Sequence, residues 1–303
     1  MSTPQLSAGD LLSYSAGSTQ TGPDGFRKVT RGGLSLTAVV RAHWPQLLAP
    51  FRGRTPVVVN AYPATIGFPT DGVLVDCYLS TRTASRALQL AAREDMPAML
   101  MCQSLFLAEL LFRHAANGLR FPDAVIAIAG GYCTPRSLLQ ALTALLAEKG
   151  VPFTLLQGYG VAEVEAGMLW GVDYDAQGRV IYRRRGPDIH AGLIDGRLHL
   201  ALLNAQGELL NAPFDTGDSA VLDGDDVLIS NARSRLSPEV MAELEGWDMD
   251  AWRRRTGYVG RADGRLVFQL REGVPAAGDN ELGYYLFGDR FGFSWLSKPQ
   301  WGL

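Results

Sequence analysis

The chain has 303 residues, 47% of them hydrophobic, which is enough to bury a substantial core in one large domain or two lobes. A net charge of −3 and a pI of about 5.8 give no indication of a nucleic-acid partner or of binding to an anionic membrane. The start of the chain has no basic segment followed by an apolar one, and the three cysteines show neither pairing nor metal-binding spacing. We therefore expect a cytoplasmic protein with reduced core thiols.

The first half of the chain predicts alternating helices and strands. Ser35 is expected to cap a helix that Pro45 ends or kinks. Thr134 and Pro135, with Gly150 beyond, are typical of the N-cap, first position and stop of a further helix. The most apolar run is interrupted by polar residues and predicts a strand and a buried helix rather than a membrane span. The other predicted elements are strands at Pro56–Asn60, Val73–Leu79, Ala98–Cys102, Ala124–Ala129 and Phe153–Gln157, and helices at Thr83–Arg93 and Leu105–Ala116.

The second half of the chain changes to short strands joined by Gly, Asp and Asn turns, with one helix predicted at Ser237–Arg255. The predicted strands are Val180–Arg184, Leu198–Leu203, Ser219–Leu222, Val227–Ile229 and Leu266–Leu270. Continuous apolar strands separated by helices predict a parallel sheet covered on both faces. The sequence thus predicts an α/β fold with a mostly parallel sheet flanked by helices, followed by a smaller antiparallel β subdomain. We expect one lobe over residues 1–157 and a second over residues 158–303.

A loop rich in glycine and hydroxyl residues lies near the N-terminus. Backbone N–H groups and hydroxyls in such a loop can form an anion cradle, and Arg27 and Lys28 add positive charge suited to a triphosphate. An ordinary N-terminal loop has a similar composition. The candidate phosphate-binding residues are Ser15, Gly17, Ser18 and Thr19.

Two further stretches contain candidate nucleotide-binding residues. Tyr159, between two glycines after a predicted strand, can lay its ring against a purine, and the nearby Glu163 carboxylate suits Mg²⁺. A tight strand-to-helix turn is the alternative. Asp218, in the run Asp215–Asp218, can accept hydrogen bonds from ribose hydroxyls, although Asp-Gly turns between short strands give the same pattern.

These stretches, followed by Gly260–Arg265, resemble in their order and intervals the nucleotide-binding signatures of the adenylate-forming (AMP-binding) superfamily. The short spacing between Glu163 and Asp218 is most similar to the phenylacetate–CoA ligase-like and acyl-protein synthetase-like branches. The resemblance implies ATP-dependent activation of a small carboxylic acid as an acyl-adenylate, with ATP and Mg²⁺ as cofactors. Transfer to the thiol of CoA or of an acyl carrier protein would follow.

The resemblance also implies roles for individual residues. Tyr159 would stack on adenine, Gly160 would be one of the cofactor-binding residues, Glu163 would bind the metal, and Asp218 would bind ribose. Arg261 would contact ribose or phosphate. The implied catalytic residues are Lys28, Glu163 and Lys298. Gly131 would form a Gly-Gly turn beside the acid pocket, for which the predicted lining residues are Tyr62, Phe68, Tyr132 and Met168.

The chain departs from the family pattern in places. Gln20 stands where a glycine is expected, and Ala162 replaces a threonine. Only about forty residues follow Asp263, too few for the family's full C-terminal lid domain, so Lys298 or a separate lid-supplying protein would have to complete the site. One alternative is therefore a catalytically degenerate subunit that binds or scaffolds within a biosynthetic complex. A second alternative, an unrelated α/β protein, predicts no nucleotide binding.

Overall fold

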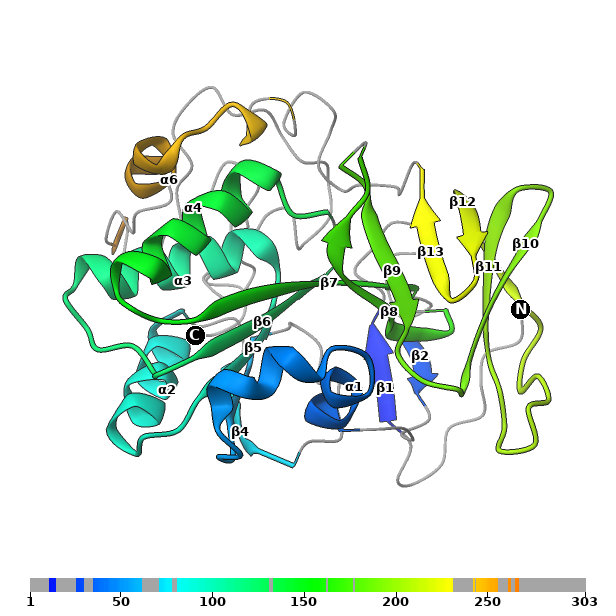
Figure 1. Ribbon diagram of the computed structural model, residues 1–303, viewed down its shortest axis with the longest axis horizontal. Helices are drawn as coiled ribbons and strands as arrows, with labels where there is room; N and C mark the ends of the chain where they lie inside the picture. Colours follow the sequence, from blue (N-terminus) through cyan, green and yellow to red (C-terminus); the bar gives the residue numbers. More distant parts are fainter. Residues whose placement is uncertain are drawn as a thin grey trace.

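An eleven-stranded sheet organises the computed structural model of the protein (Figure 1). The structure describes residues 11–14, 26–29, 35–61, 71–77, 81–130, 133–161, 163–176, 178–230, 242, 244–255, 261–262 and 265–266. No helix among these residues is long and apolar enough to cross a membrane.

Five strands at one end of the sheet are parallel. From the edge inward they are β4 (Val73–Asp76), β3 (Val57–Asn60), β5 (Ala98–Cys102), β6 (Val125–Gly130) and β7 (Phe153–Val161). Helices cover both faces, as expected for strands that are apolar throughout. The helices are α1 (Leu36–His43), the 3₁₀ helix η2 (Pro45–Phe51), α2 (Thr81–Arg93), α3 (Ser104–Ala116), α4 (Arg136–Glu148) and α6 (Met249–Arg255).

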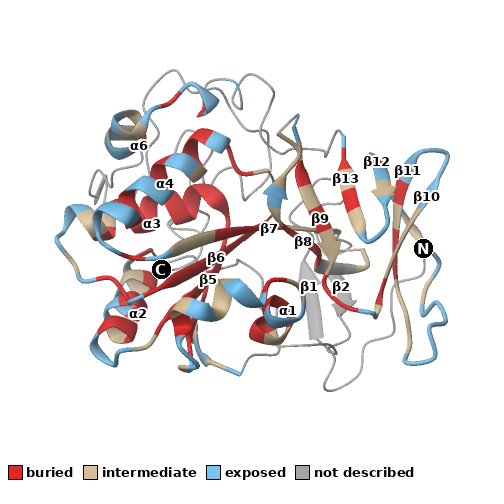
Figure 2. Cartoon of the chain, in the orientation of Figure 1, coloured by how far each residue is buried: buried red, intermediate tan, exposed pale blue. Residues whose placement is uncertain are grey.

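Side chains of the parallel strands alternate between two buried clusters. On β5, Leu100 and Cys102 pack with residues of α2, α3, α4 and α6, whereas Met99 and Met101 pack with residues of α1 and η2. Figure 2 shows the resulting buried centre, in red, along β5, β6 and β7. The alternation follows from the two-residue period of a strand, so the two faces of the sheet can be assigned residue by residue.

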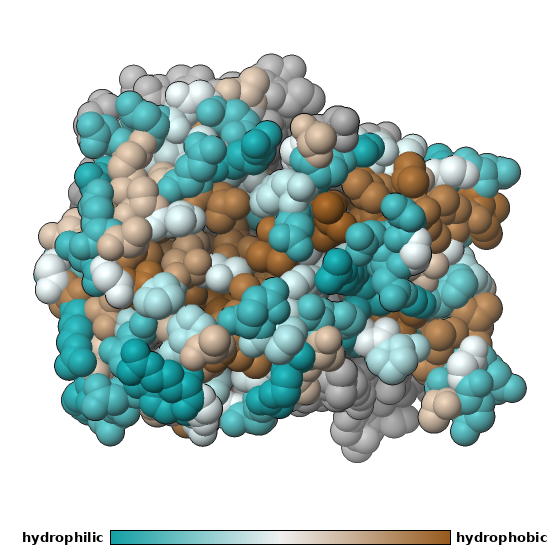
Figure 3. All heavy atoms as spheres, viewed as in Figure 1, coloured by the Kyte–Doolittle hydropathy of each residue, from teal (hydrophilic) through white to brown (hydrophobic). Residues whose placement is uncertain are grey.

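The rest of the sheet is antiparallel. Its strands, outward from β7, are β8 (Glu165–Tyr174), β9 (Val180–Arg184), β13 (Asp226–Ile229), β12 (Phe214–Asp223), β11 (Arg197–Leu202) and β10 (Ile189–Ile194). These strands enclose a third buried cluster of their own. Part of their surface is apolar (Figure 3), and the most exposed large apolar residues in this half are Leu193, Ile194, Leu209, Leu210 and Val221.

Two small hairpins complete the description. The first pairs β1 (Leu11–Tyr14) with β2 (Phe26–Val29), and the second pairs β14 (Arg261–Ala262) with β15 (Arg265–Leu266). The architecture confirms the predicted α/β class, with a parallel sheet flanked by helices and a smaller antiparallel region. The expected lobe boundary after residue 157 falls inside β7, and the division into two lobes stays a prediction.

The boundaries of several elements differ from the prediction. The strand predicted to end at Gln157 continues to Val161, and the strand predicted from Ser219 begins at Phe214. Strands β8 and β10 were not predicted. In each case an antiparallel neighbour supplies backbone hydrogen bonds to residues of low intrinsic strand propensity, such as glycine and aspartate.

The predicted N-cap of α4 was wrong. Helix α4 begins at Arg136, and the Thr134 hydroxyl instead donates to the Gln157 side chain at 3.0 Å. The Glu245 carboxylate accepts hydrogen bonds from the backbone N–H groups of Arg136, at 2.8 Å, and Ser137, at 3.1 Å. An anion at a helix N-terminus is stabilised by the unpaired N–H groups and the helix dipole, so a distant carboxylate provides the cap.

The predicted helix over Ser237–Arg255 is interrupted before α6. Asp248 lies outside the helix, and its side chain accepts a hydrogen bond from the Ala251 N–H at 2.7 Å. This is the contact of an N-cap, which starts a new helix rather than continuing an old one. Trp252 of α6 is fully buried and its indole N–H donates to the Ser137 hydroxyl at 3.2 Å.

Buried Glu109 on α3 gives a prediction for the pH dependence of stability. Burial raises the pKa of Glu109 to about 8, against the opposing effects of Arg113 at 3.7 Å and the Thr81 hydroxyl at 3.4 Å. The folded state therefore binds this proton more tightly than the unfolded state, so its contribution to stability is complete below about pH 4.5 and is lost as the pH rises through about 8.

We expect Glu109→Gln to flatten that decline, because glutamine has no proton to lose. At pH 9 the variant should exceed the wild type in free energy of unfolding by on the order of 2 kcal/mol or more, measured by urea denaturation from pH 5 to 9. Glu94→Gln, at an exposed position after α2, is the control. Parallel pH profiles for the wild type and Glu109→Gln would contradict the prediction.

Candidate functional site

The hairpin formed by β7 and β8 positions the first of the predicted nucleotide-binding stretches. Tyr159 pairs with Leu169, and Val161 pairs with Glu165, with a register irregularity between them. Glu163 lies in the turn at the tip, and Gly160 lies on β7 itself. The alternative of a strand-to-helix turn was therefore wrong, because the stretch leads from one strand into the next.

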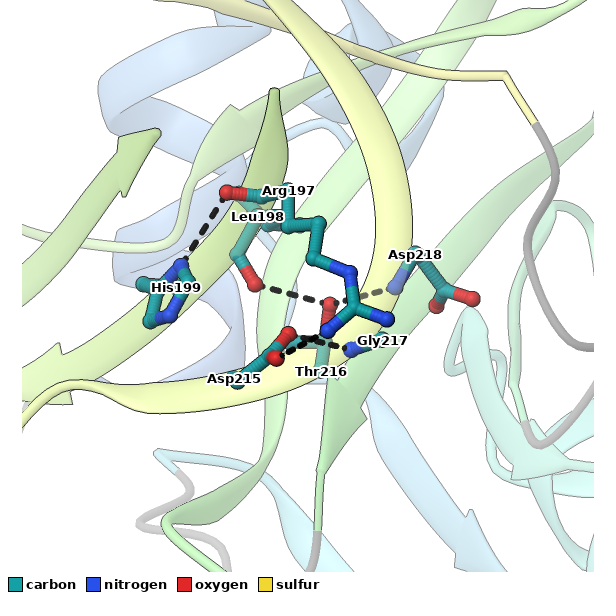
Figure 4. Close-up of polar contacts among 7 residues, drawn as sticks. All are labelled: Arg197, Leu198, His199, Asp215, Thr216, Gly217 and Asp218. Atoms are coloured by element: carbon teal, nitrogen blue, oxygen red, sulfur yellow. Dashed lines mark hydrogen bonds and ion pairs between the residues drawn. The ribbon is translucent and has the colours of Figure 1, made fainter. Parts of the chain in front are cut away.

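The second stretch, Asp215–Asp218, lies at an irregularity of β12 that is held by side-chain hydrogen bonds (Figure 4). Asp215 accepts a hydrogen bond from the Gly217 N–H at 2.8 Å, and the Thr216 hydroxyl accepts one from the Asp218 N–H at 3.1 Å. The same hydroxyl donates to the Leu198 carbonyl at 2.9 Å. Gly217 has φ +76°, a left-handed conformation that favours glycine.

The pairing of β11 with β12 shows what the irregularity does. Arg197 pairs with Ser219, but His199, two residues further on, pairs with Asp215, four residues away on β12. The extra residues are accommodated by the turn-like hydrogen bonds described above, and bulges of this kind turn side chains out of the regular alternation. They leave the Asp218 side chain buried, with 4% of the residue exposed.

An ion pair anchors the outer side of this segment. Arg197 donates to Asp215 at 2.6 Å. The Gly217 N–H, followed by the Arg197 charge, holds the pKa of Asp215 below its usual value. Both side chains are substantially exposed, so the pair contributes little to stability and acts mainly to fix geometry.

A hydrogen bond joins the two stretches. The Tyr159 hydroxyl donates to Asp218 Oδ2 at 2.5 Å, although the residues are 59 positions apart. Burial, together with this bond to Asp218, raises the pKa of Tyr159, so the hydroxyl keeps its proton and remains the donor. This contact brings the two stretches together in the fold, and their roles in nucleotide binding stay a prediction.

Aromatic and thiol groups surround the Tyr159–Asp218 pair. The rings of Tyr159 and Tyr182 lie 5.9 Å apart, centre to centre, at 56°. Burial, and then the charge of Asp218, raises the pKa of Cys133, and burial raises the pKa of Tyr182. These groups are therefore neutral near pH 7 and form an apolar wall rather than a nucleophilic centre.

A separate group of buried polar residues lies near the carboxyl ends of the parallel strands. Thr134 Oγ1 donates to Gln157 Oε1 at 3.0 Å, and Ser104 Oγ lies 2.5 Å from Thr134 Oγ1. All three residues are at most 5% exposed. The sequence analysis missed them, although hydroxyl and amide residues directly after apolar strands mark the edge where open α/β sheets bind ligands.

Other predicted site residues are only partly described or lie outside the described residues. Lys28 lies on β2 and Arg261 on β14, and only their backbone pairing is described. Met168 is fully buried in the core of the antiparallel region. The predicted residues outside the described part are Ser15, Gly17, Ser18, Thr19, Tyr62, Phe68, Gly131, Tyr132 and Lys298.

The described residues contain no cluster of three or more histidine, cysteine or carboxylate side chains that could hold a metal ion. Glu163 is thus a single candidate carboxylate. That donor set fits Mg²⁺ bound to a nucleotide, because Mg²⁺ commonly uses one or two carboxylates together with phosphate oxygens and water. It does not fit a structural metal held by protein alone.

No family model matches the chain, and no curated protein matches it in sequence. Among solved structures it is similar to an acyl-CoA synthetase (AMP-forming)/AMP-acid ligase II-like protein from Dyadobacter fermentans, with 16% identity and a TM-score of 0.45. That match covers 73% of this chain and 59% of the other.

The amide bond synthetase McbA from Marinactinospora thermotolerans matches at 13% identity and a TM-score of 0.40, over 73% of this chain and 48% of the other. CmiS6 matches at 15% identity and a TM-score of 0.29, over 75% and 69%. All three TM-scores are below 0.5, so the function proposed below rests on the residues of the site.

We expect Tyr159 and Asp218 to be energetically coupled. Tyr159→Phe removes the donor and leaves a buried carboxylate oxygen without it, which should lower the free energy of unfolding by about 1–3 kcal/mol. In a double-mutant cycle with Asp218→Asn, measured by urea denaturation, the coupling should be at least about 0.5 kcal/mol. Asp223→Asn, at the exposed end of β12, is the matched control. Additive effects would show that the bond contributes nothing.

Proposed function

We propose that this protein is an adenylate-forming ligase, which activates a carboxylic acid with ATP. The observation that carries the proposal is the contact between Tyr159 and Asp218. It joins an aromatic ring suited to a purine with a carboxylate suited to ribose hydroxyls, at the end of the parallel sheet where ligands bind.

Glu163 supports the proposal by its position. It lies in the turn four residues beyond Tyr159, so a nucleotide stacked on that ring would bring its phosphates toward the tip of the β7–β8 hairpin. Mg²⁺ held there by Glu163 and phosphate oxygens would neutralise charge on the nucleotide. Arg261, at the start of β14, is the proposed further contact to ribose or phosphate.

The β1–β2 hairpin is consistent with a phosphate-binding loop. Tyr14 pairs with Phe26, so the two ends of the segment containing Ser15, Gly17, Ser18 and Thr19 lie side by side. Lys28 follows on β2. A closed loop of glycine and hydroxyl residues, followed by a cation, is suited to bind the β- and γ-phosphates.

In the proposed reaction a carboxylate oxygen of the acid attacks the α-phosphorus of ATP. A bond forms between that oxygen and the α-phosphorus, the bond from the α-phosphorus to the oxygen bridging to the β-phosphate breaks, and pyrophosphate leaves. The protein contributes positioning and charge neutralisation rather than covalent chemistry. In the second proposed step the thiol of CoA or of a carrier protein attacks the acyl carbon, the bond from that carbon to the phosphate oxygen breaks and AMP leaves. Lys298 or a separate protein would complete the site for this step.

A degenerate, nucleotide-binding subunit without catalysis is the second candidate. It is favoured by Ala162, which places no hydroxyl beside Glu163, and by Gln20 in the predicted phosphate loop. Both candidates retain Tyr159 and Asp218, so both should bind a nucleotide. Only catalytic turnover distinguishes them.

Carboxylate-dependent ATP–pyrophosphate exchange, run alongside calorimetric ATP binding, tests the proposal. We expect exchange with one class of acid, and a loss of about 10- to 100-fold in kcat/KM for ATP in Asp218→Asn, because a charged hydrogen bond is lost. Glu163→Gln should abolish the Mg²⁺-dependent rate, whereas Asp223→Asn should leave it unchanged.

The outcomes separate the candidates. ATP binding without exchange for any acid would favour the degenerate subunit. The absence of ATP binding would contradict both candidates and favour an unrelated α/β protein.

A further inference from the structure

A hollow of about 850 Å³ lies at the amino edge of the parallel strands. Its walls are the end of η2, the loop that leads into β6 and the turn that leads from α4 into β7. The candidate nucleotide site lies at the opposite edge, because Phe153 begins β7 and Tyr159 lies near the far end of this strand. The six residue steps between them span roughly 20 Å in an extended strand, so the two sites are separate.

Three cationic side chains line the hollow, one from each wall. Arg52 is the C-cap of η2, Arg120 lies in the loop before β6, and Lys149 is the C-cap of α4. Asp123 is the one carboxylate among the described residues that line the hollow. That carboxylate already accepts a hydrogen bond from Arg54 at 2.9 Å, so it does not balance the three lining cations.

Both lining arginines lie close to Asp123. The hydrogen bond from Arg54 is the main reason that the pKa of Asp123 lies below its usual value, against the opposing effect of burial. The charges of Arg120 and Arg52 lower this pKa further, which places both guanidinium groups in electrostatic range of one carboxylate. Arg120 also contacts Asp95 at 3.5 Å, but the two side chains are 67% and 73% exposed. Such an exposed ion pair contributes little and leaves the guanidinium group accessible to a ligand.

The local charge is positive in a chain whose net charge is −3. The four basic residues named above oppose two carboxylates, Asp95 and Asp123, which leaves two positive charges in excess. Within the part of the chain that the structure describes, neither Arg52 nor Lys149 forms an ion pair. A concave surface lined by one sign of charge concentrates its electric field, so the hollow attracts anions.

Helix ends explain part of this charge. A basic side chain at a helix C-terminus is stabilised by the partial negative charge there, which accounts for Lys149 and in part for Arg52. The effect is confined to the last turn, and Arg120 lies four residues beyond Ala116, the last residue of α3. The hollow therefore carries more positive charge than its helix ends account for.

From these residues we infer a binding site for a small molecule that bears two phosphate groups. Such a molecule carries at least two negative charges, which match the excess. The planar guanidinium groups of Arg52 and Arg120 suit paired hydrogen bonds to phosphate oxygens, and the ammonium group of Lys149, on a separate wall, suits the second phosphate. The volume lies within the range of about 300–1,000 Å³ that is typical of small-molecule sites, so there is room for an organic body as well.

Two sources supply this chemistry. Pyrophosphate is the inorganic source, and it is also released in the reaction proposed above. An organic bisphosphate, such as a sugar bisphosphate, is the other source, and its carbon body would contact the apolar walls formed by Phe121, Pro122 and Val151. The site does not depend on the proposed function, since none of its residues belongs to the candidate nucleotide site.

Calorimetric titration of the full chain tests the inference, without Mg²⁺ so that pyrophosphate is a free anion. The probes are pyrophosphate, fructose 1,6-bisphosphate, fructose 6-phosphate and inorganic phosphate. We expect at least one probe with two phosphate groups to bind at least about tenfold more tightly than either monophosphate, because it makes more charged hydrogen bonds. Tighter binding of pyrophosphate would identify the inorganic source, and tighter binding of the bisphosphate the organic one.

Charge-removing variants locate the site. Arg120→Gln and Lys149→Gln should each weaken binding of the preferred probe by at least about fivefold, because each removes a charged contact. Both positions are exposed, so both variants should retain the wild-type Tm. Arg41→Gln, at an exposed position of α1, is the matched control and should change neither quantity. Lys28→Gln, in the predicted phosphate-binding stretch, should also leave the affinity unchanged.

Four results would overturn the inference. The first two are no binding of either two-phosphate probe to the wild type, and affinity for a monophosphate equal to that for both of them. The third is an affinity that survives Arg120→Gln and Lys149→Gln, or that is lost in Lys28→Gln alone, since the probe would then lie elsewhere. The fourth is a lower Tm that accompanies each loss of affinity, which would assign these residues a structural role.

Discussion

Strand β7 is shared by both halves of the sheet, and this sharing is the constraint on which the candidate site depends. Along one edge β7 pairs in parallel with β6, and along the other it pairs antiparallel with β8. The antiparallel pairing continues past the end of the parallel one, so β7 extends beyond the edge where the other parallel strands stop. Tyr159 lies on this extension, within reach of Asp218 on β12.

Polar groups are concentrated where the parallel strands end. Gln103, Thr134 and Gln157 are buried there among apolar strands, and part of their hydrogen-bonding capacity is unused in the described residues. A buried polar atom without a partner costs about 1–3 kcal/mol, which is large against the net stability of a domain. The free energy of unfolding is therefore lower than it would be with apolar residues at this edge of the sheet. Such a cost is common where a protein binds a ligand.

Much of the parallel half could be predicted from the sequence, because its information is local. The apolar run Ala98–Cys102 is bounded as predicted, and Ser35 caps α1 with its side chain accepting from the Ala38 N–H at 3.2 Å. In the antiparallel half the pairing partner decides where a strand ends, and that partner is distant in sequence. Strands β8 and β10 therefore went unpredicted, and β12 was predicted too short.

The candidate site divides in the same way. Tyr159 and Asp218 could be selected from motif order, since both types of residue are suited to a nucleoside. Ser104, Thr134 and Gln157 could not, because each is an ordinary polar residue beside an apolar strand until the fold joins their side chains by hydrogen bonds. Residue chemistry is visible in a sequence, whereas contacts between polar side chains that are distant in sequence depend on the three-dimensional fold.

The carboxylate of Glu245 at the start of α4 has a consequence for how the protein is made. The cap lies 109 residues beyond Arg136, the first residue of the helix that it completes, so the first turn of α4 stays open while the ribosome synthesises the whole antiparallel half. Burial of Trp252 against Ser137 must wait for the same segment. The helical layer over the parallel half is therefore completed only after the antiparallel half has been synthesised. A nascent chain released before residue 245 would expose that layer to chaperones and proteases.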